Sequence, residues 1–114
     1  MSRILVFLGA ALLALTSIFH LTGWSEAVNL LDGNAGNIIS FLWLVPAVTW
    51  GFVAAIWAYS GIKKQPWTIV TTAVSFIPLI NGLLMLLIVG TSHPGGYLLC
   101  VSSVLAIVGA RDLK

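Results

Sequence analysis

The stretch that decides the fold runs NIISFLWLVPAVTWGFVAAIWAYS, from Asn37 to Ser60, and contains no Asp, Glu, Lys or Arg. A helix needs about 20 apolar residues, at about 1.5 Å each, to cross the hydrocarbon core of a bilayer. The stretch therefore predicts a membrane-spanning helix. Trp43, Trp50 and Trp57 recur every seven residues, which places them along one face of that helix.

The composition of the whole chain agrees with this prediction. Of the 114 residues, 60% are hydrophobic and 7% are charged, whereas a soluble domain carries about 25% charged residues. The chain is therefore predicted to be one integral-membrane domain, residues 1–114, in the plasma membrane or a bacterial inner membrane. Its net charge of +2 is too small to indicate a nucleic-acid partner. A single cysteine, Cys100, excludes an intramolecular disulfide.

Three further apolar segments complete the prediction of an all-α, four-span transmembrane helical bundle. The spans are expected at about 3–21, 37–60, 66–89 and 94–110. The first resembles a secretory signal but lacks a small-x-small cleavage site, so it is expected to remain as an anchor. In the loop after it, Ser25 is predicted to cap a short helix on the membrane surface, and Asn37 is predicted to cap the second span.

The orientation follows from the basic residues, which lie only at the two termini and in the second loop. They are Arg3, Lys63, Lys64, Arg111 and Lys114. Because positive charge accumulates on the cytoplasmic side, both termini are predicted to be cytoplasmic.

Two prolines inside spans, Pro46 and Pro78, predict bends in the second and third helices, since each ring removes a backbone hydrogen bond. The tight connection between these spans predicts that both bends lie at a similar depth. A pocket is therefore expected in the outer half of the bundle, beside Asn81. Trp43, Thr49, Trp50 and Asn81 are the candidate ligand-binding residues, and the ligand would be apolar or lipid-like. The alternative is structural: Trp57 forms a cytoplasmic interfacial belt with Tyr59 and Trp67, and Trp43 and Trp50 fill the helix seam. In this alternative Asn81 joins two helices.

Acidic and basic side chains are missing from the span interiors, where such groups mark proton-coupled carriers. In length and number of spans the chain resembles the small multidrug resistance transporters. Those proteins are built around a glutamate in the first span, and this first span has none.

Four titratable residues are expected on the outer side, and three of them suggest a metal site: His20, Glu26 and His93. The two histidines, on different helices, also suit a b-type haem. The alternative is that they are interfacial polar residues, with His93 or Ser92 capping the fourth span. The sequence names no cofactor.

No serine is arranged with a base for nucleophilic catalysis, so the chain is predicted not to be an enzyme. Three functions remain. The first is a non-enzymatic accessory, assembly or immunity-type subunit packed against another membrane protein, suggested by the small-residue ridge of Ser102, Ala106 and Ala110. The second is a homo-oligomeric transporter or binder of an apolar or lipid-like ligand. The third is a metal- or haem-binding protein. Expected partners are membrane lipid and another membrane protein or a second copy.

Overall fold

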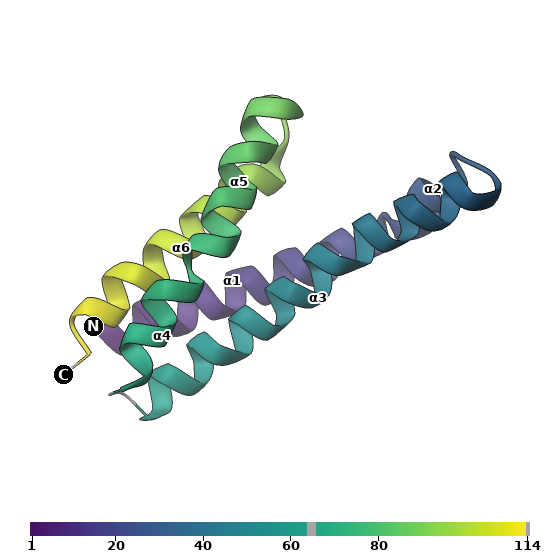
Figure 1. Cartoon of the computed structure of the whole chain (residues 1–114). Coiled ribbons are helices and arrows are strands. Elements are labelled where there is room, and N and C mark those ends of the chain that lie inside the picture. The colour runs from purple at the N-terminus through teal and green to yellow at the C-terminus, as the bar shows by residue number, and fades with distance from the viewer. Residues whose placement is uncertain (64–65, 114) are drawn as a thin grey trace.

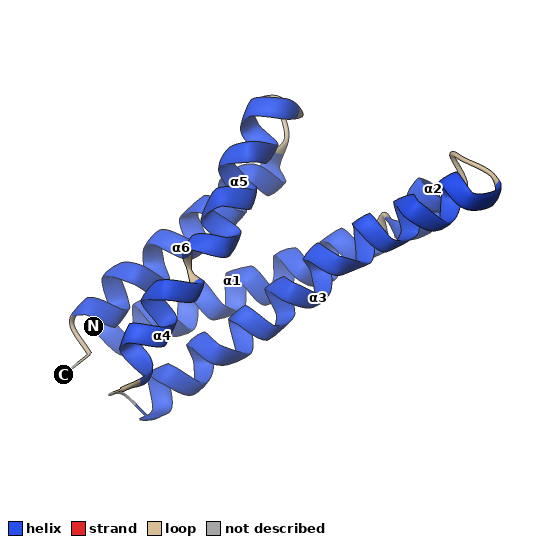
Figure 2. Cartoon of the chain, in the orientation of Figure 1, coloured by secondary structure: helices blue, strands red, loops and turns tan. Residues whose placement is uncertain are grey.

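The computed structural model describes residues 1–63 and 66–113, and every regular element in this part of the chain is a helix (Figure 2). Two of the basic residues used for the orientation, Lys64 and Lys114, lie outside the described residues. In chain order the helices are α1 (Ser2–Thr22), α2 (Trp24–Val28), α3 (Gly33–Lys63), α4 (Trp67–Val74), α5 (Phe76–Ile88) and α6 (Pro94–Arg111).

The helices form four units that are long and apolar enough to cross a membrane. They are Ser2–Val28, Gly33–Lys63, Trp67–Ile88 and Pro94–Arg111. The predicted all-helical chain with four candidate spans is therefore confirmed. The two termini lie at the same end of the molecule (Figure 1). Two hairpins result: α1–α2 with α3, and α4–α5 with α6.

The boundaries between the first two spans differ from the prediction. α3 begins at Gly33, whose φ of 62° suits glycine, so Asn37 lies inside the helix and does not cap it. Ser25 lies inside α2, and the residue before that helix is Gly23. α2 packs on α3 and belongs to the same candidate span as α1. The predicted short helix therefore exists, and it extends the first hairpin.

Glycines bring α1 and α6 into close contact. A Cβ added at Gly9 would lie 2.8 Å from the carbonyl oxygen of Ser102, and one added at Gly109 would lie 2.7 Å from that of Ser2. Ser102, Ala106 and Ala110 are all buried. The predicted small-residue ridge thus exists, and α1 of the same chain covers it.

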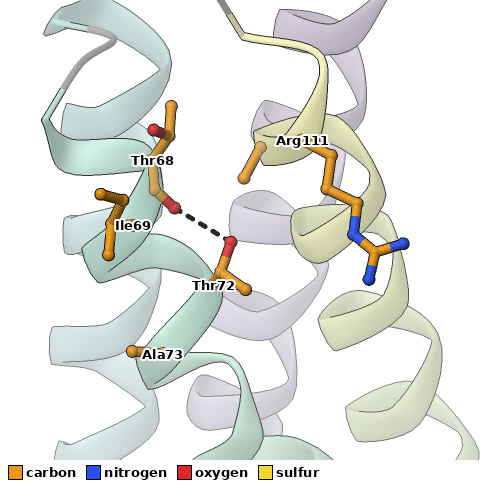
Figure 3. Close-up of a pocket in the computed structure, with 6 residues that line it drawn as sticks. Thr68, Ile69, Thr72, Ala73 and Arg111 are labelled. Carbon is orange, nitrogen blue, oxygen red and sulfur yellow. Dashed lines mark hydrogen bonds between the residues drawn. The ribbon is translucent and has the colours of Figure 1, made fainter.

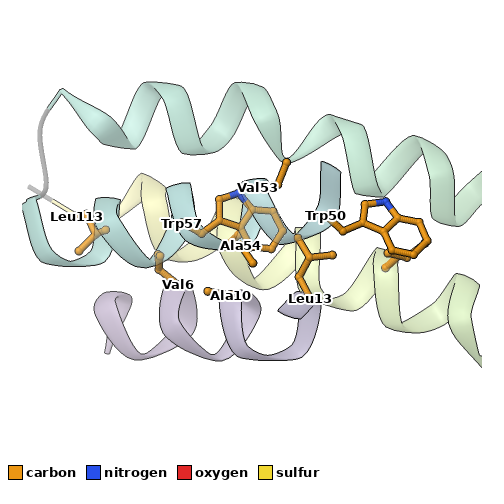
Figure 4. Close-up of a cluster of buried hydrophobic side chains, with 10 residues drawn as sticks. Val6, Ala10, Leu13, Trp50, Val53, Ala54, Trp57 and Leu113 are labelled. Carbon is orange, nitrogen blue, oxygen red and sulfur yellow. The ribbon is translucent and has the colours of Figure 1, made fainter. Parts of the chain in front are cut away.

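The core lies in the half of the bundle that holds the termini, where α1, α3 and α6 meet (Figure 4). Trp57 is 0% exposed and Trp50 4% exposed in this core. The prediction that Trp57 belongs to an interfacial belt is therefore wrong. Tyr59 and Trp67 do lie partly exposed beside the α3–α4 connection, as an edge-to-face pair with ring centroids 4.9 Å apart.

The two prolines inside candidate spans have different effects. The third candidate span is interrupted at Ser75, between α4 and α5 and three residues before Pro78. In contrast, α3 continues through Pro46 as one helix of 31 residues. The helical run is therefore broken before Pro78 but unbroken at Pro46. α4 packs on both α3 and α6, whereas α5 packs mainly along α6. As a result the two hairpins diverge away from the termini (Figure 1).

Candidate functional site

Where the two hairpins diverge, the structure contains a cavity of about 780 Å³ that opens sideways between α3 and α5. The wall on α3 is formed by Leu42, Trp43, Pro46 and Trp50. The opposite wall is formed by Asn81, Leu84, Met85, Ile88 and Val89, with Leu99 of α6 and His20 of α1 between the two walls. We call this cavity the lateral cleft. Its lining is almost entirely hydrocarbon, which suits an apolar ligand.

A second cavity, of about 490 Å³, adjoins the lateral cleft on the side of the loops far from the termini. The two cavities share His20, Trp43, Met85 and Val89 as lining residues. The second one adds polar groups, including Thr22, Glu26 and His93. We call it the polar mouth. Together they form an apolar cleft that ends in a polar region, an arrangement that matches an amphipathic molecule.

His20 and Trp43 hold the first hairpin together at the junction of these cavities. The Nε1–H of Trp43 donates to the carbonyl oxygen of His20 at 2.7 Å, and Nε2 of His20 lies 3.1 Å from the carbonyl oxygen of Trp43. Because a carbonyl only accepts, Nε2 carries the proton in this bond. The two rings stack with centroids 4.5 Å apart and planes 7° from parallel. This pair gives the cleft a rigid wall.

Two polar side chains without partners lie at the deep end of the lateral cleft. The indole nitrogen of Trp50 is buried and has no hydrogen-bonding partner within the described residues. Asn81 is half-buried on the opposite wall, and its amide makes no hydrogen bond to the described part of the chain. The predicted role of Asn81 as a bond between helices is therefore not seen. Both groups add hydrogen-bonding capacity to an otherwise apolar space.

Three of the four predicted ligand-binding residues, Trp43, Trp50 and Asn81, line the lateral cleft together. Thr49 is not among its lining residues, and its hydroxyl donates to the carbonyl oxygen of Val45 within α3, at 2.8 Å. Sequence reasoning did not assign Leu84 and Met85 to the site. No local signal distinguishes them from neighbouring apolar residues of α5.

The three predicted metal ligands, His20, Glu26 and His93, all line the polar mouth. Within residues 1–63 and 66–113, no group of three or more His, Cys, Asp or Glu side chains is close enough to hold a metal ion. Nδ1 of His93 accepts the backbone N–H of Gly95 at 3.2 Å, so His93 caps α6. This confirms the structural alternative for His93. Nδ1 of His20 and Nε2 of His93 take no part in the hydrogen bonds described above.

A separate cavity of about 430 Å³ lies near the termini, between α4 and the end of α6 (Figure 3). Thr68, Thr72 and Arg111 are among its lining residues. The hydroxyl of Thr72 donates to the carbonyl oxygen of Thr68 at 3.0 Å, so it is already satisfied within α4. Arg111 is the charged residue among those that line this cavity.

Fold and site together define an all-helical protein with four candidate membrane spans and one lateral, mostly apolar cleft between its two hairpins. No family model, curated protein or solved structure matches the chain.

Proposed function

We propose that this protein binds one amphipathic, lipid-like molecule in the lateral cleft. The observation that carries the proposal is the cleft's composition: an apolar channel between α3 and α5 that continues into a mouth containing His20, Glu26 and His93. The hydrocarbon part of the ligand would lie against Trp43, Leu84 and their neighbours. Its polar end would lie in the mouth, where histidine and carboxylate groups offer hydrogen bonds.

The wider membrane setting is part of the same proposal. We place the chain in the plasma membrane or a bacterial inner membrane, with both termini in the cytoplasm, on the basis of the positive charges at that end. The polar mouth then lies toward the outer surface. A ligand would enter sideways from the lipid, because the cleft opens between helices that diverge.

The test is a titration with dibromostearate, whose bromine atoms quench tryptophan fluorescence on contact. Trp43 and Trp50 line the cleft, so the wild-type protein in maltoside micelles should show saturable quenching. Leu84→Phe adds a ring inside the cleft and should weaken binding by about tenfold, which corresponds to about 1.4 kcal/mol.

Leu83→Phe is the matched control. Leu83 and Leu84 are 50% and 48% exposed on the same helix, but only Leu84 lines the cleft. The control variant should bind dibromostearate as the wild type does. Quenching that is non-saturable and equal in all three proteins would contradict the proposal, because it would reflect general contact with the micelle.

An accessory role beside another membrane protein is the second candidate. The ridge on α6 no longer supports it, since α1 covers Ser102 and Ala106. The open cleft provides different support, because a helix from a partner also fits between diverging hairpins. Purification from native membranes distinguishes the two. A stoichiometric protein partner that Leu84→Phe releases would favour the accessory role, and a retained lipid would favour ligand binding.

A further inference from the structure

Two hydrogen-bonding side chains lie at the deep end of the lateral cleft, and a purely hydrocarbon ligand would make no hydrogen bond to either. Trp50 and Asn81 lie on opposite walls there, one on α3 and one on α5. Trp50 lies 13 residues before Lys63, and Asn81 lies 14 residues after Trp67. At about 1.5 Å per residue, both are about 20 Å from the α3–α4 connection. They therefore face the cleft at the same depth, well inside the bilayer.

Both side chains offer hydrogen-bond donors. The Trp50 indole has one N–H and no acceptor, and the Asn81 amide has two N–H groups and one acceptor oxygen. The indole nitrogen of Trp50 is on the edge of the ring that faces the α4–α5 side (Figure 4). It is buried and has no hydrogen-bonding partner among residues 1–63 and 66–113, although the Trp50 ring lines the cavity. In a hydrocarbon environment, unpaired donors of this kind are costly.

From these donors we infer that the ligand carries a carbonyl oxygen at its inner end. The inference rests on the proposed function and specifies its ligand: an otherwise apolar molecule with a ketone, quinone or similar carbonyl group about halfway across the membrane. Asn81 donates to this oxygen from α5, and a small rotation of the Trp50 ring brings the second donor from α3. A carbonyl accepts two hydrogen bonds through its two lone pairs, so one ligand oxygen can accept from both Asn81 and Trp50.

The experiment compares two probes, methyl nonyl ketone and dodecane, which have the same number of non-hydrogen atoms. Each is measured by displacement of dibromostearate from the wild-type protein. A hydrogen bond to the oxygen should make the ketone bind about 3- to 10-fold more tightly than the alkane. Asn81→Leu and Trp50→Phe should each reduce this preference for the ketone over the alkane toward one.

Trp57→Phe is the matched control. Trp57 is 0% exposed, and its indole nitrogen also has no partner in the described part of the chain, but Trp57 does not line the cleft. This variant should keep the full preference for the ketone. If Asn81→Leu and Trp50→Phe keep the preference as well, the inference is wrong, even though ligand binding itself stands. If neither probe displaces dibromostearate, and dibromostearate itself does not saturate, the proposed function has failed.

A second measurement needs no variant and covers the case in which a substitution prevents folding. Infrared spectra of the carbonyl-labelled ketone bound to the wild-type protein should show the C=O stretch at lower frequency than in hexane, because a hydrogen bond weakens the C=O bond. A bound ketone that keeps its hexane frequency would overturn the inference.

Discussion

At the scale of single residues, polar side chains decide how α1 meets α3. The hydroxyl of Ser17 donates to the carbonyl oxygen of Ala47 at 2.7 Å, and His20 and Trp43 exchange two bonds one turn further along. All of these are bonds between helices, in contrast to those of Ser102 and Ser103, which bond Leu99 within α6. Only the bonds between helices are lost when the helices separate.

This difference predicts unequal effects of two serine substitutions. Ser17→Ala should lower the stability of the protein in detergent by about 0.6 to 1.7 kcal/mol, the range for hydrogen bonds between helices in membranes. Ser103→Ala should have almost no effect, since its bond within α6 is also present in a separated helix. Both serines are buried, so burial is matched. Thermal unfolding followed by circular dichroism measures both, and equal losses would contradict the argument.

The candidate site gives a second prediction at the scale of single residues. Asn81→Leu should leave thermal stability close to that of the wild type, because the amide makes no hydrogen bond within the described residues that the substitution would break. Thermal unfolding without added ligand measures this effect. A loss of about 0.6 kcal/mol or more would instead assign Asn81 to helix packing.

At the scale of elements, glycine positions set the distance between helices. Gly9 and Gly109 leave space for α6 and α1 respectively, and Gly82 does the same for α5 against α6, where an added Cβ would lie 2.8 Å from the carbonyl oxygen of Gly96. Gly51 of α3 has no such neighbour, the nearest atom being Oγ of Ser17 at 3.8 Å. The four glycines therefore have different structural roles although all lie in helices.

Two alanine substitutions test this assignment. Gly9→Ala should destabilise the protein by about 1 to 3 kcal/mol, because the backbone of α6 must move to admit a methyl group. Gly51→Ala should keep stability unchanged or raise it by up to about 1 kcal/mol, because alanine is the better helix former. The readout is the unfolding midpoint in detergent. A Gly9→Ala variant as stable as Gly51→Ala would rule out close α1–α6 packing as the reason for the glycine.

At the scale of the whole molecule, the break at Ser75 separates two regions with different packing. α4 packs against both α3 and α6 beside the core, whereas α5 follows α6 away from α3. The terminal half of the bundle is therefore closed, and the other half is open as the lateral cleft.

The orientation of the molecule in the membrane is tested by single cysteines in a Cys100→Ala background. Cysteines at Asn34 and Thr91 lie in or beside the loops at the cleft end, and those at Ser2 and Asp112 lie at the terminal end. A membrane-impermeant maleimide should label the first two in intact cells and the last two only after permeabilisation, as the positive charges predict. The reverse pattern would show that the termini are outside.

Much of the fold could be predicted from the sequence, because a bilayer imposes its thickness on each apolar segment. Uncharged stretches of span length, separated by glycine, proline and charge, indicate four helices without knowledge of any contact. The fourth span and its cap illustrate this: α6 extends one residue beyond the predicted end, and His93 caps it. The sequence also placed Trp43, Trp50 and Asn81 near one another, since their depths follow from helix rise alone.

The tertiary structure alone decided which helix faces pack together and where two helices separate. The helix through Pro46 remains continuous, the adjoining span breaks at Ser75, and Trp57 is buried in the core. None of these follows from periodicity, because each depends on the side chains of another helix. The same holds for the lateral cleft, which exists because α1 and α6 approach at glycines while α3 and α5 diverge. The depth of a residue in a membrane follows from its position along one helix, whereas a cavity depends on how several helices pack together.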